Sequence, residues 1–345
     1  MEGYSVLIVG GGLAGLSAAM HLKRLGIGDV AVVERMSGDL YGRYHRICGE
    51  AVSERFLKLS GADRGCIVRS IDSIKVSCGS TDIRFQVKGH IIDREALLES
   101  TRDECGAIMV NASVTGVEPA EGGFLVHSTA GDIGCRYLIG ADGAFSVVRK
   151  DIIGTSPEVK LAAANHLVER DSETSELGFK ISPVHPGMYS WDFPSKDGRR
   201  SIGSTYRTED PPHSVEKGTR FIVCGSDRTV VEGNCCIVGD AAMLANPISY
   251  GGIGAALLSG RKAAEAIAKD DLSSYQRWVR RDVMFDRRFM ESFNRIKGWD
   301  AKDVEQAVAP FRKGFSYPRA LYAMMRHPML ASVYTSIWMG FRRGW

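Results

Sequence analysis

Short apolar runs separated by glycines open the chain. Tyr4–Val9 and Val30–Val33 are nearly continuous apolar stretches, which are typical of strands buried on both faces of a sheet. Leu13–Leu25, which lies between them, has apolar residues at helical spacing and predicts a helix. A strand, a helix and a second strand in this order predict a βαβ unit of a parallel sheet.

Two later regions alternate apolar with polar residues. Residues 67–87 and 157–225 show this pattern, which predicts antiparallel strands with one solvent-facing side. Buried strands and helices return between and after these regions, and residues from Ser273 onward have a helical pattern. The further elements predicted are helices over Asp93–Cys105 and Ile253–Ala268, and strands over Met109–Val114 and Cys235–Val238.

This order of elements predicts an α/β protein. We expect a Rossmann-type nucleotide-binding domain interleaved with an antiparallel-sheet substrate domain, followed by a helical C-terminus. The nucleotide-binding domain is predicted from residues 1–65, 93–155 and 226–272, the substrate domain from 66–92 and 156–225, and the helical region from 273–345.

The composition is that of an ordinary globular protein. With 345 residues, 44% hydrophobic and 25% charged, and a net charge of +3, the chain is neither disordered nor collagen-like, and it is not broadly nucleic-acid-binding. Its eight cysteines form no C-x-x-C pair and no zinc-ligand spacing, so we expect free thiols, no metal site and a cytoplasmic protein. The uncharged stretches 6–22 and 241–260 are broken by glycines and Pro247, so neither predicts a membrane span.

A glycine-rich turn joins the first predicted strand to the first helix. Gly10, Gly12 and Gly15 form G-x-G-x-x-G, in which the glycines permit a tight turn, backbone approach to a pyrophosphate and close helix–strand packing. The helix N-terminus would then face the phosphates. Glu34 ends the second strand, where a carboxylate accepts hydrogen bonds from a ribose. This context predicts a dinucleotide site.

Two further motifs follow predicted strands. Gly140-Ala-Asp142-Gly143 is the first, and Gly239-Asp240 is the second, followed by Pro247 and by Gly251-Gly-Ile-Gly254 at a helix start. With the glycine-rich turn, this series resembles the flavoprotein family that includes p-hydroxybenzoate hydroxylase and the archaeal geranylgeranyl reductases. In that family the second motif supports the FAD phosphates and the aspartate of the third binds the ribityl chain. The glycines after it lie beside the flavin's pyrimidine end.

Two patterns resemble the geranylgeranyl reductases in particular. They are Arg46-Ile-Cys48-Gly49-Glu-Ala51 and Tyr189-Ser-Trp191-Asp-Phe193-Pro194, which match the family's Cys-Gly pair beside the flavin and its Y-x-W-x-F-P segment. The family continues with G-x-G, but here Gly203 is followed by Thr205 in place of the second glycine. The resemblance covers roughly residues 4–270 well and the C-terminus weakly.

The resemblance implies FAD as the cofactor. Because no second G-x-G-x-x-G occurs, the electron donor is either a transiently docked NAD(P)H or a protein such as ferredoxin. In the family an arginine at the position of Arg94 reaches the FAD, and the backbone at the position of Val114 meets the adenine. The cofactor contacts implied are Gly10, Gly12, Ala14, Gly15, Glu34, Arg35, Arg46, Cys48, Gly49, Ala51, Arg94, Val114, Asp142, Gly143, Asp240, Pro247, Gly251, Gly252, Ile253 and Gly254.

The implied activity is reduction of isolated C=C bonds in prenyl chains, with geranylgeranyl groups of archaeal-type lipids as substrate. Tyr189, Trp191 and Phe193 alternate, so they share one strand face, which either walls a tunnel that also includes Pro194 or forms a sheet core. A hydride from flavin N5 needs a matching proton, for which the candidate donors are Cys48, Tyr189 and water, while aromatic side chains such as Trp191 stabilise developing cationic character. We therefore assign catalytic roles to Cys48, Tyr189 and Trp191.

Other activities use the same scaffold. An aromatic monooxygenase or a flavin halogenase is the main alternative, although Tyr189 and Phe193 favour the reductase over the W-x-W-x-I-P segment of halogenases. A flavin-binding electron-transfer or lipid-carrier module without catalysis is a third reading. Intact site motifs make this module the weakest of the three.

The C-terminal region is basic and aromatic. Residues 271–345 hold 14 Lys and Arg against 7 Asp and Glu, and the segment Phe311–Trp345 holds no acidic residue. This pattern predicts either a helical lid over the substrate tunnel or peripheral contact with an anionic membrane surface, and the two are compatible. The partners expected are a prenyl lipid and an electron donor, without nucleic acid.

Overall fold

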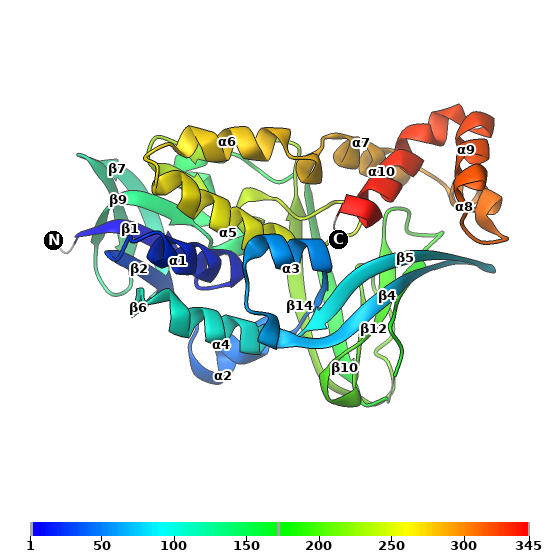
Figure 1. Ribbon diagram of the computed structural model, residues 1–345, viewed down its shortest axis with the longest axis horizontal. Helices are drawn as coiled ribbons and strands as arrows, with labels where there is room; N and C mark the ends of the chain where they lie inside the picture. The colour runs from blue at the N-terminus through cyan, green and yellow to red at the C-terminus, as the bar shows by residue number, and fades with distance from the viewer. Residues whose placement is uncertain (1–2, 171–172, 344–345) are drawn as a thin grey trace.

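Two mixed sheets lie side by side and helices cover the first of them (Figure 1). The computed structural model describes residues 3–170 and 173–343. The first sheet has the strand order β15-β16-β9-β1-β2-β6, with the β7–β8 hairpin added to β9. The second has the order β14-β10-β13-β12-β11-β4-β5-β3.

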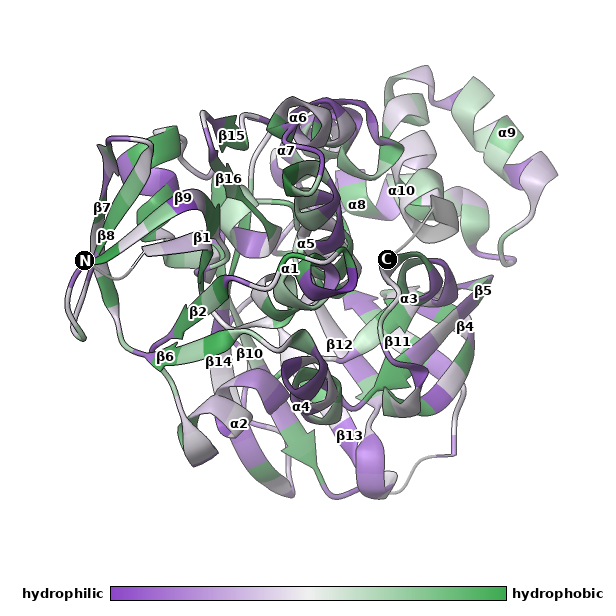
Figure 2. Cartoon of the chain, turned by 60° about the vertical axis from the view of Figure 1, so that its left-hand side comes forward, coloured by the Kyte–Doolittle hydropathy of each residue, from purple (hydrophilic) through white to green (hydrophobic). Residues whose placement is uncertain are grey.

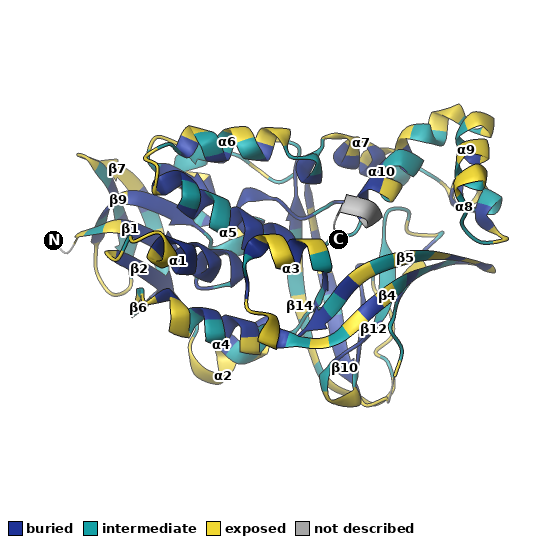
Figure 3. Cartoon of the chain, viewed as in Figure 1, coloured by how far each residue is buried: buried dark blue, intermediate teal, exposed yellow. Residues whose placement is uncertain are grey.

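The centre of the first sheet is parallel and buried. β1 pairs in parallel with β2 and β9, β2 with β6, and β9 with β16. The adjoining parts of β1, β2 and β9 are buried and mostly apolar, as is typical of the centre of a parallel sheet, and Figure 3 shows β9 largely in dark blue. Their bounds are β1 Gly3–Val9, β2 Val30–Glu34, β6 Ile108–Asn111, β7 Val114–Ala120, β8 Gly123–Ser128, β9 Ile133–Gly140, β15 Val231–Glu232 and β16 Cys235–Ile237.

Helix α1 (Leu13–Arg24) connects β1 to β2 and packs on α5 (Ile253–Ile267). The two helix backbones approach closely at Gly260, where an added Cβ would lie 2.3 Å from the carbonyl oxygen of Ala14. Ser17 Oγ donates to the carbonyl oxygen of Leu257 at 2.7 Å across the same contact. This contact joins the first turns of α1 to the middle of α5. The remaining helices of this part are α2 Gly38–Arg46, α3 Glu54–Ser60 and α4 Arg94–Cys105.

The second sheet is built mainly from antiparallel pairs, as the alternating pattern predicts. One pair differs, because β11 runs parallel to β4, so the sheet is mixed rather than purely antiparallel. β3 lies in a segment expected in the nucleotide-binding domain, yet it pairs with β5 at the edge of this sheet. The strands are β3 Ala51–Ser53, β4 Ile67–Cys78, β5 Thr81–Ile92, β10 Val159–Val168, β11 Glu176–Ile181, β12 Tyr189–Pro194, β13 Arg200–Ser204 and β14 Ser214–Cys224.

The C-terminal helices extend from the first sheet to the outer end of the β4–β5 hairpin (Figure 1). Phe311 and Phe315 pack with Phe85 of β5, and the Phe85–Phe315 ring centroids are 4.9 Å apart. Part of this region therefore covers the second sheet, in the manner of a lid. The helices are α6 Leu272–Arg281, α7 Arg288–Lys297, α8 Ala301–Val308, α9 Tyr317–Arg326 and α10 Ala331–Arg343, with short 3₁₀ turns η7 Ala309–Phe311 and η8 Pro328–Leu330.

One predicted strand end is wrong. β6 ends at Asn111, and Val114 begins β7 instead of closing the strand from Met109. The chain reverses at this point because β7 leaves the parallel sheet to pair antiparallel with β8. Val114 nevertheless remains close to the carboxyl end of β6.

Among the described residues, no helix is long and apolar enough to cross a membrane.

We predict that Gly260→Ala destabilises the protein even though alanine is the better helix former. Alanine gains about 1 kcal/mol of helix propensity, but forcing a methyl group into the α1–α5 contact costs about 1–3 kcal/mol, and here the obstacle is backbone. Chemical denaturation should therefore show a lower free energy of unfolding. Gly340→Ala in α10 is the matched control, since its Cβ would lie 3.8 Å from Phe289, an ordinary contact, and should leave stability equal or higher. Equal stability changes in the two variants would contradict the close contact.

Candidate active site

The glycine-rich turn after β1 is closely packed against its surroundings. Gly10 has φ +104°, and a Cβ there would lie 2.4 Å from the carbonyl oxygen of Ala141. A Cβ on Gly15 would lie 1.9 Å from the carbonyl oxygen of Gly10. Gly12 caps α1 without a side-chain hydrogen bond, so the first N–H groups of the helix are left for a ligand. This is the geometry expected of a pyrophosphate cradle.

Glu34 closes this turn from the end of β2. Its buried carboxylate accepts hydrogen bonds from the N–H groups of Gly11, at 2.7 Å to Oε2, and Met36, at 2.8 Å to Oε1. Each carboxylate oxygen has a second lone pair that a ribose hydroxyl can use. Glu34 thus both orders the turn and remains suited to the ribose.

The second and third motifs meet the first at the carboxyl edge of the sheet. Asp142 accepts hydrogen bonds from Ser146 Oγ at 2.5 Å and from the Val147 N–H at 2.7 Å, which holds the turn after β9. Gly239 has φ +59°, and a Cβ there would lie 2.9 Å from the Cβ of Ala14. Buried Arg149 donates to the carbonyl oxygen of Ala241 at 2.9 Å and so joins the second motif to the third.

Asp240 lies beside the start of α5. A Cβ on Gly252 would lie 3.4 Å from Asp240 Oδ1, so this glycine leaves room at the carboxylate. Burial raises the pKa of Asp240, against the opposing charges of Arg220 and Arg94. Gly252 caps α5 without a side-chain hydrogen bond, as Gly12 does for α1. Two helix N-termini therefore converge on one region.

A cluster of three arginines from two elements faces this region. Arg94 begins α4, Arg102 belongs to the same helix, and Arg220 comes from β14 in the second sheet. Burial and the charge of Arg94 lower the pKa of Arg220. The Nε atoms of Arg94 and Arg102 are buried without a hydrogen-bond partner. Concentrated positive charge of this kind is suited to a bound dianion such as a pyrophosphate.

His45 is held neutral within this cluster. Burial, followed by the charges of Arg94, Arg220 and Arg102, lowers the pKa of His45 to about 2. Both ring nitrogens are buried without hydrogen-bond partners. His45 therefore does not supply a proton as an imidazolium at neutral pH.

The Cys48–Gly49 loop packs directly against the aromatic strand β12. A Cβ on Gly49 would lie 2.9 Å from Phe193 Cδ2 and 3.5 Å from Trp191 Nε1. Ser201 Oγ donates to the Cys48 carbonyl oxygen at 3.2 Å, which fixes the loop to β13. The loop thus joins the two sheets at the place where the aromatic side chains lie.

The aromatic side chains of β12 share one face, as their alternation predicts. The ring centroids of Tyr189 and Trp191 are 6.3 Å apart, and those of Trp191 and Phe193 are 6.4 Å apart. Trp191 Nε1 donates to Asn165 Oδ1 at 3.0 Å, and its ring lies across Gly203, where a Cβ would come within 2.1 Å of Cζ2. A glycine is therefore required at position 203 by the indole itself.

The hydroxyl group of Tyr189 is already engaged. It donates to the carbonyl oxygen of Ser249, and the ring stacks on Tyr250 at 5.3 Å. Burial raises the pKa of Tyr189 well above its ordinary value. Tyr250 lies three residues before α5, the helix of the third motif, so this contact connects the aromatic face to that motif.

Glu50 is a site residue that sequence analysis missed. It has φ +54° and a 3% exposed surface, and its Oε1 accepts a hydrogen bond from the Arg94 N–H at 3.2 Å. Burial, with a contribution from Asp93, raises the pKa of Glu50 to about 8. Its position directly after Gly49 was the available signal. Arg220 was also missed, because it comes from a strand with no motif.

Some predicted cofactor residues have other contacts. The Arg46 guanidinium binds Glu95 and Glu216, each at 3.1 Å, and so bridges α4 to β14. Arg35 is exposed at the end of β2. Ala51 pairs with Ile91 in the second sheet. Pro194 ends β12 in a buried position, whereas Gly143, Pro247, Gly251, Ile253 and Gly254 lie in the turns and helix start of the second and third motifs.

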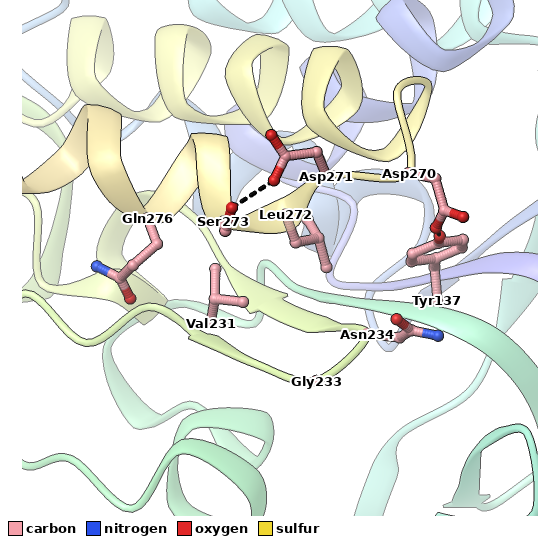
Figure 4. Close-up of a pocket in the computed structure, with 9 residues that line it drawn as sticks. All are labelled: Tyr137, Val231, Gly233, Asn234, Asp270, Asp271, Leu272, Ser273 and Gln276. Carbon is pink, nitrogen blue, oxygen red and sulfur yellow. Dashed lines mark hydrogen bonds between the residues drawn. The ribbon is translucent and has the colours of Figure 1, made fainter.

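A separate pocket of about 340 Å³ lies away from these motifs (Figure 4). Its lining includes Tyr137, Asn234, Asp270 and Gln276. Asn234 directly precedes β16, so this pocket borders the amino end of a strand whose carboxyl end leads to the third motif. None of its lining residues is a predicted site residue.

The fold and the converging motifs define an FAD-dependent oxidoreductase. The family described as pyridine nucleotide-disulphide oxidoreductase matches residues 7–174. A structure described as a geranylgeranyl bacteriochlorophyll reductase-like protein from Thermoplasma acidophilum aligns with a TM-score of 0.77 at 20% identity, over 96% of this chain and 99% of that one. A Klebsiella pneumoniae protein solved with FAD and uric acid aligns with a TM-score of 0.68 at 16% identity, over 96% and 97%.

Sequence relatives identify the family. Digeranylgeranylglycerophospholipid reductase 2 of Methanothermobacter thermautotrophicus is 30% identical over 76% of this chain and 78% of its own length. Digeranylgeranylglycerophospholipid reductase 1 of the same organism is 28% identical over 81% and 82%. The chain belongs to the digeranylgeranylglycerophospholipid reductase family.

We predict that Arg220→Ala weakens FAD binding. A charge-assisted hydrogen bond to a phosphate contributes about 1.5–3 kcal/mol, so the dissociation constant should rise at least about tenfold. Titration of apoprotein with FAD by calorimetry measures this change. Lys217→Ala, on the same strand and three residues away, removes the same charge from an exposed position and should leave the affinity unchanged. Equal dissociation constants for the two variants would contradict the assignment of Arg220.

We also predict a pH-dependent stability difference for Glu50→Gln. Because the folded pKa is about 8 against an ordinary 4.5, the unfolded chain loses this proton first as pH rises, and stability falls between these values. Glutamine does not ionise, so the variant does not lose stability in this way. The free energy of unfolding of the variant minus that of the wild type should therefore increase by several kcal/mol from pH 4.5 to pH 8. Urea denaturation across this range tests the prediction. A stability difference that stays constant with pH would show that Glu50 keeps its ordinary pKa.

Proposed function

We propose that this protein reduces isolated C=C bonds in prenyl chains, with geranylgeranyl groups of archaeal-type isoprenoid lipids as its substrate. The observation that carries the proposal is the contact between the Cys48–Gly49 loop and the aromatic face of β12, which also contacts Tyr250 just before α5. An apolar aromatic wall next to a redox cofactor is suited to a hydrocarbon chain. Relatives named as reductases of geranylgeranyl lipids support the same substrate class.

The three motifs would hold reduced FAD, which would supply a hydride from N5, while the second alkene carbon would take up a proton. An unactivated alkene polarises weakly, so the chain must hold the double bond in place and exclude water. Phe193 is buried, and Phe179 packs on both Phe193 and Tyr189 at centroid distances of 5.0 and 5.1 Å. The rings of Trp191 and its neighbours stabilise positive charge that develops on the carbon skeleton.

The proton donor that the contacts favour is Cys48. The Tyr189 hydroxyl group already donates a hydrogen bond to the carbonyl oxygen of Ser249. Burial raises the pKa of this phenol, which opposes its ionisation. Cys48 is half-buried, and its Sγ accepts a hydrogen bond from the Glu50 N–H at 3.4 Å, which orients the thiol. Glu50, two residues away in sequence and with a pKa of about 8, retains its proton at neutral pH. Bound water remains the alternative donor.

The electron donor is either NAD(P)H, docking transiently, or a protein such as ferredoxin. The chain carries one G-x-G-x-x-G, and the structure uses it in the turn before α1. Reduction of the holoprotein by each donor under anaerobic conditions distinguishes the two.

Anaerobic single turnover tests the proposed function. We expect dithionite-reduced holoprotein to be reoxidised by a geranylgeranyl lipid, with mass spectrometry showing the gain of two hydrogens for each reduced bond. If the lipid leaves the flavin reduced, while air reoxidises it and a phenol yields an oxygenated product, the protein is a monooxygenase and the proposal fails.

The same assay tests Cys48. Cys48→Ala should lower the single-turnover rate constant by roughly a hundredfold, because general acid catalysis contributes on the order of 10²–10⁴. Cys78→Ala removes a buried thiol at the end of β4 and is the matched control. Bound FAD must be equal in both variants. An unchanged rate and pH profile in Cys48→Ala would assign the proton to water.

A further inference from the structure

The aromatic and basic C-terminal segment divides into a packed part and an exposed part. Phe311 and Phe315 stack at a centroid distance of 6.0 Å, and Tyr334 packs on Phe311 at 5.6 Å. Ala323 of α9 is fully buried in the same cluster. This inner side of α9 is therefore occupied by the protein's own core.

The outer side of α9 and the following turn η8 present large apolar side chains to solvent. These side chains are 57–74% exposed. Within α9, Tyr317, Leu321 and Met325 recur at intervals of four residues, so they lie along one helix face. Figure 2 shows α9 as an outermost element with hydrophobic segments. We call these residues the α9 face: Tyr317, Leu321, Tyr322, Met325 and Met329.

The α9 face is held in place by the rest of the fold. Ser316 caps α9 by accepting a hydrogen bond from the Arg319 N–H, and Arg319 donates to the carbonyl oxygen of Gly314 at 2.8 Å. Arg295 of α7 donates to the carbonyl oxygen of Met329. The exposed side chains thus stand on an ordered helix and turn, and they do not belong to a frayed end.

The charged residues of the segment that carries the α9 face are of one sign. Arg312, Lys313 and Arg326 are exposed beside it, and the segment Phe311–Trp345 holds no acidic residue. The nearest acidic residues in sequence are Asp303 and Glu305 of α8. Apolar side chains flanked by arginine and lysine complement a surface that has an anionic outer layer over an apolar interior.

We propose that the α9 face docks this protein on an anionic lipid bilayer. Leu321, Met325 and Met329 enter the apolar layer, and the tyrosines take the interfacial level that aromatic residues with a polar end prefer. A second copy of the chain is a poorer occupant, since a two-fold contact through this face would bring its basic residues together. The inference goes beyond the proposed function, because no active-site residue belongs to the α9 face.

Co-sedimentation of the full-length holoprotein with vesicles tests the docking surface. We expect binding to vesicles that contain phosphatidylglycerol to exceed binding to phosphatidylcholine alone. The triple variant Leu321→Ser, Met325→Ser and Met329→Ser should lower the partition coefficient at least about tenfold on the anionic vesicles. Ile108→Ser, which alters an equally exposed residue on the edge strand β6, is the matched control and should bind as the wild type does.

A second variant tests the charges. Arg312→Gln, Lys313→Gln and Arg326→Gln together should reduce binding to the anionic vesicles by roughly a hundredfold and make the residual binding insensitive to salt. All variants alter exposed side chains, and their FAD content and single-turnover rate on detergent-dispersed lipid should match the wild type. These two measurements separate loss of docking from loss of activity, so docking can hold even if prenyl reduction fails.

Three results would overturn the inference. The first is a wild type that binds neither kind of vesicle. The second is a triple variant that binds as strongly as the wild type. The third is a triple variant that sediments as a monomer when the wild type is a dimer, which would make the α9 face a contact between copies.

Discussion

Close backbone contact at the carboxyl edge of the first sheet is the constraint on which the site depends. Gly10 lies against Ala141, and Gly239 lies against Ala14, so the three motifs can meet only where side chains are absent or small. This proximity leaves the N-termini of α1 and α5 uncapped by side chains and directed to one region. Backbone N–H groups at these two helix ends therefore provide capacity to bind an anionic cofactor. A substitution of a surface side chain cannot supply such groups.

The second sheet completes the site by supplying what the first lacks. Arg220 brings positive charge from β14, and the aromatic face of β12 brings an apolar wall. The Cys48–Gly49 loop stands between them. The ion pairs of Arg46 with Glu95 and Glu216 link the two parts near this loop, and because they are partly exposed they orient the sheets more than they stabilise them. The cofactor motifs and the aromatic face thus lie on different sheets, and the Cys48–Gly49 loop packs on the aromatic face.

The C-terminal helices have two sides with different surroundings. Their inner aromatic residues close the outer end of the second sheet, where Phe315 meets Phe85. Their outer residues form the α9 face. The same helices therefore have one side that packs on the second sheet and another that faces solvent.

The sequence alone determined the βαβ start, the turn motifs and the alternating strands, because periodicity and glycine spacing are local properties. It also indicated the shared face of Tyr189, Trp191 and Phe193. Only the tertiary structure decided that Arg220 and Glu50 belong to the site, since their burial and charge environment arise from segments far apart in sequence. The same holds for which C-terminal aromatic residues are buried and for the mixed pairing of β11 with β4, because packing between elements sets both.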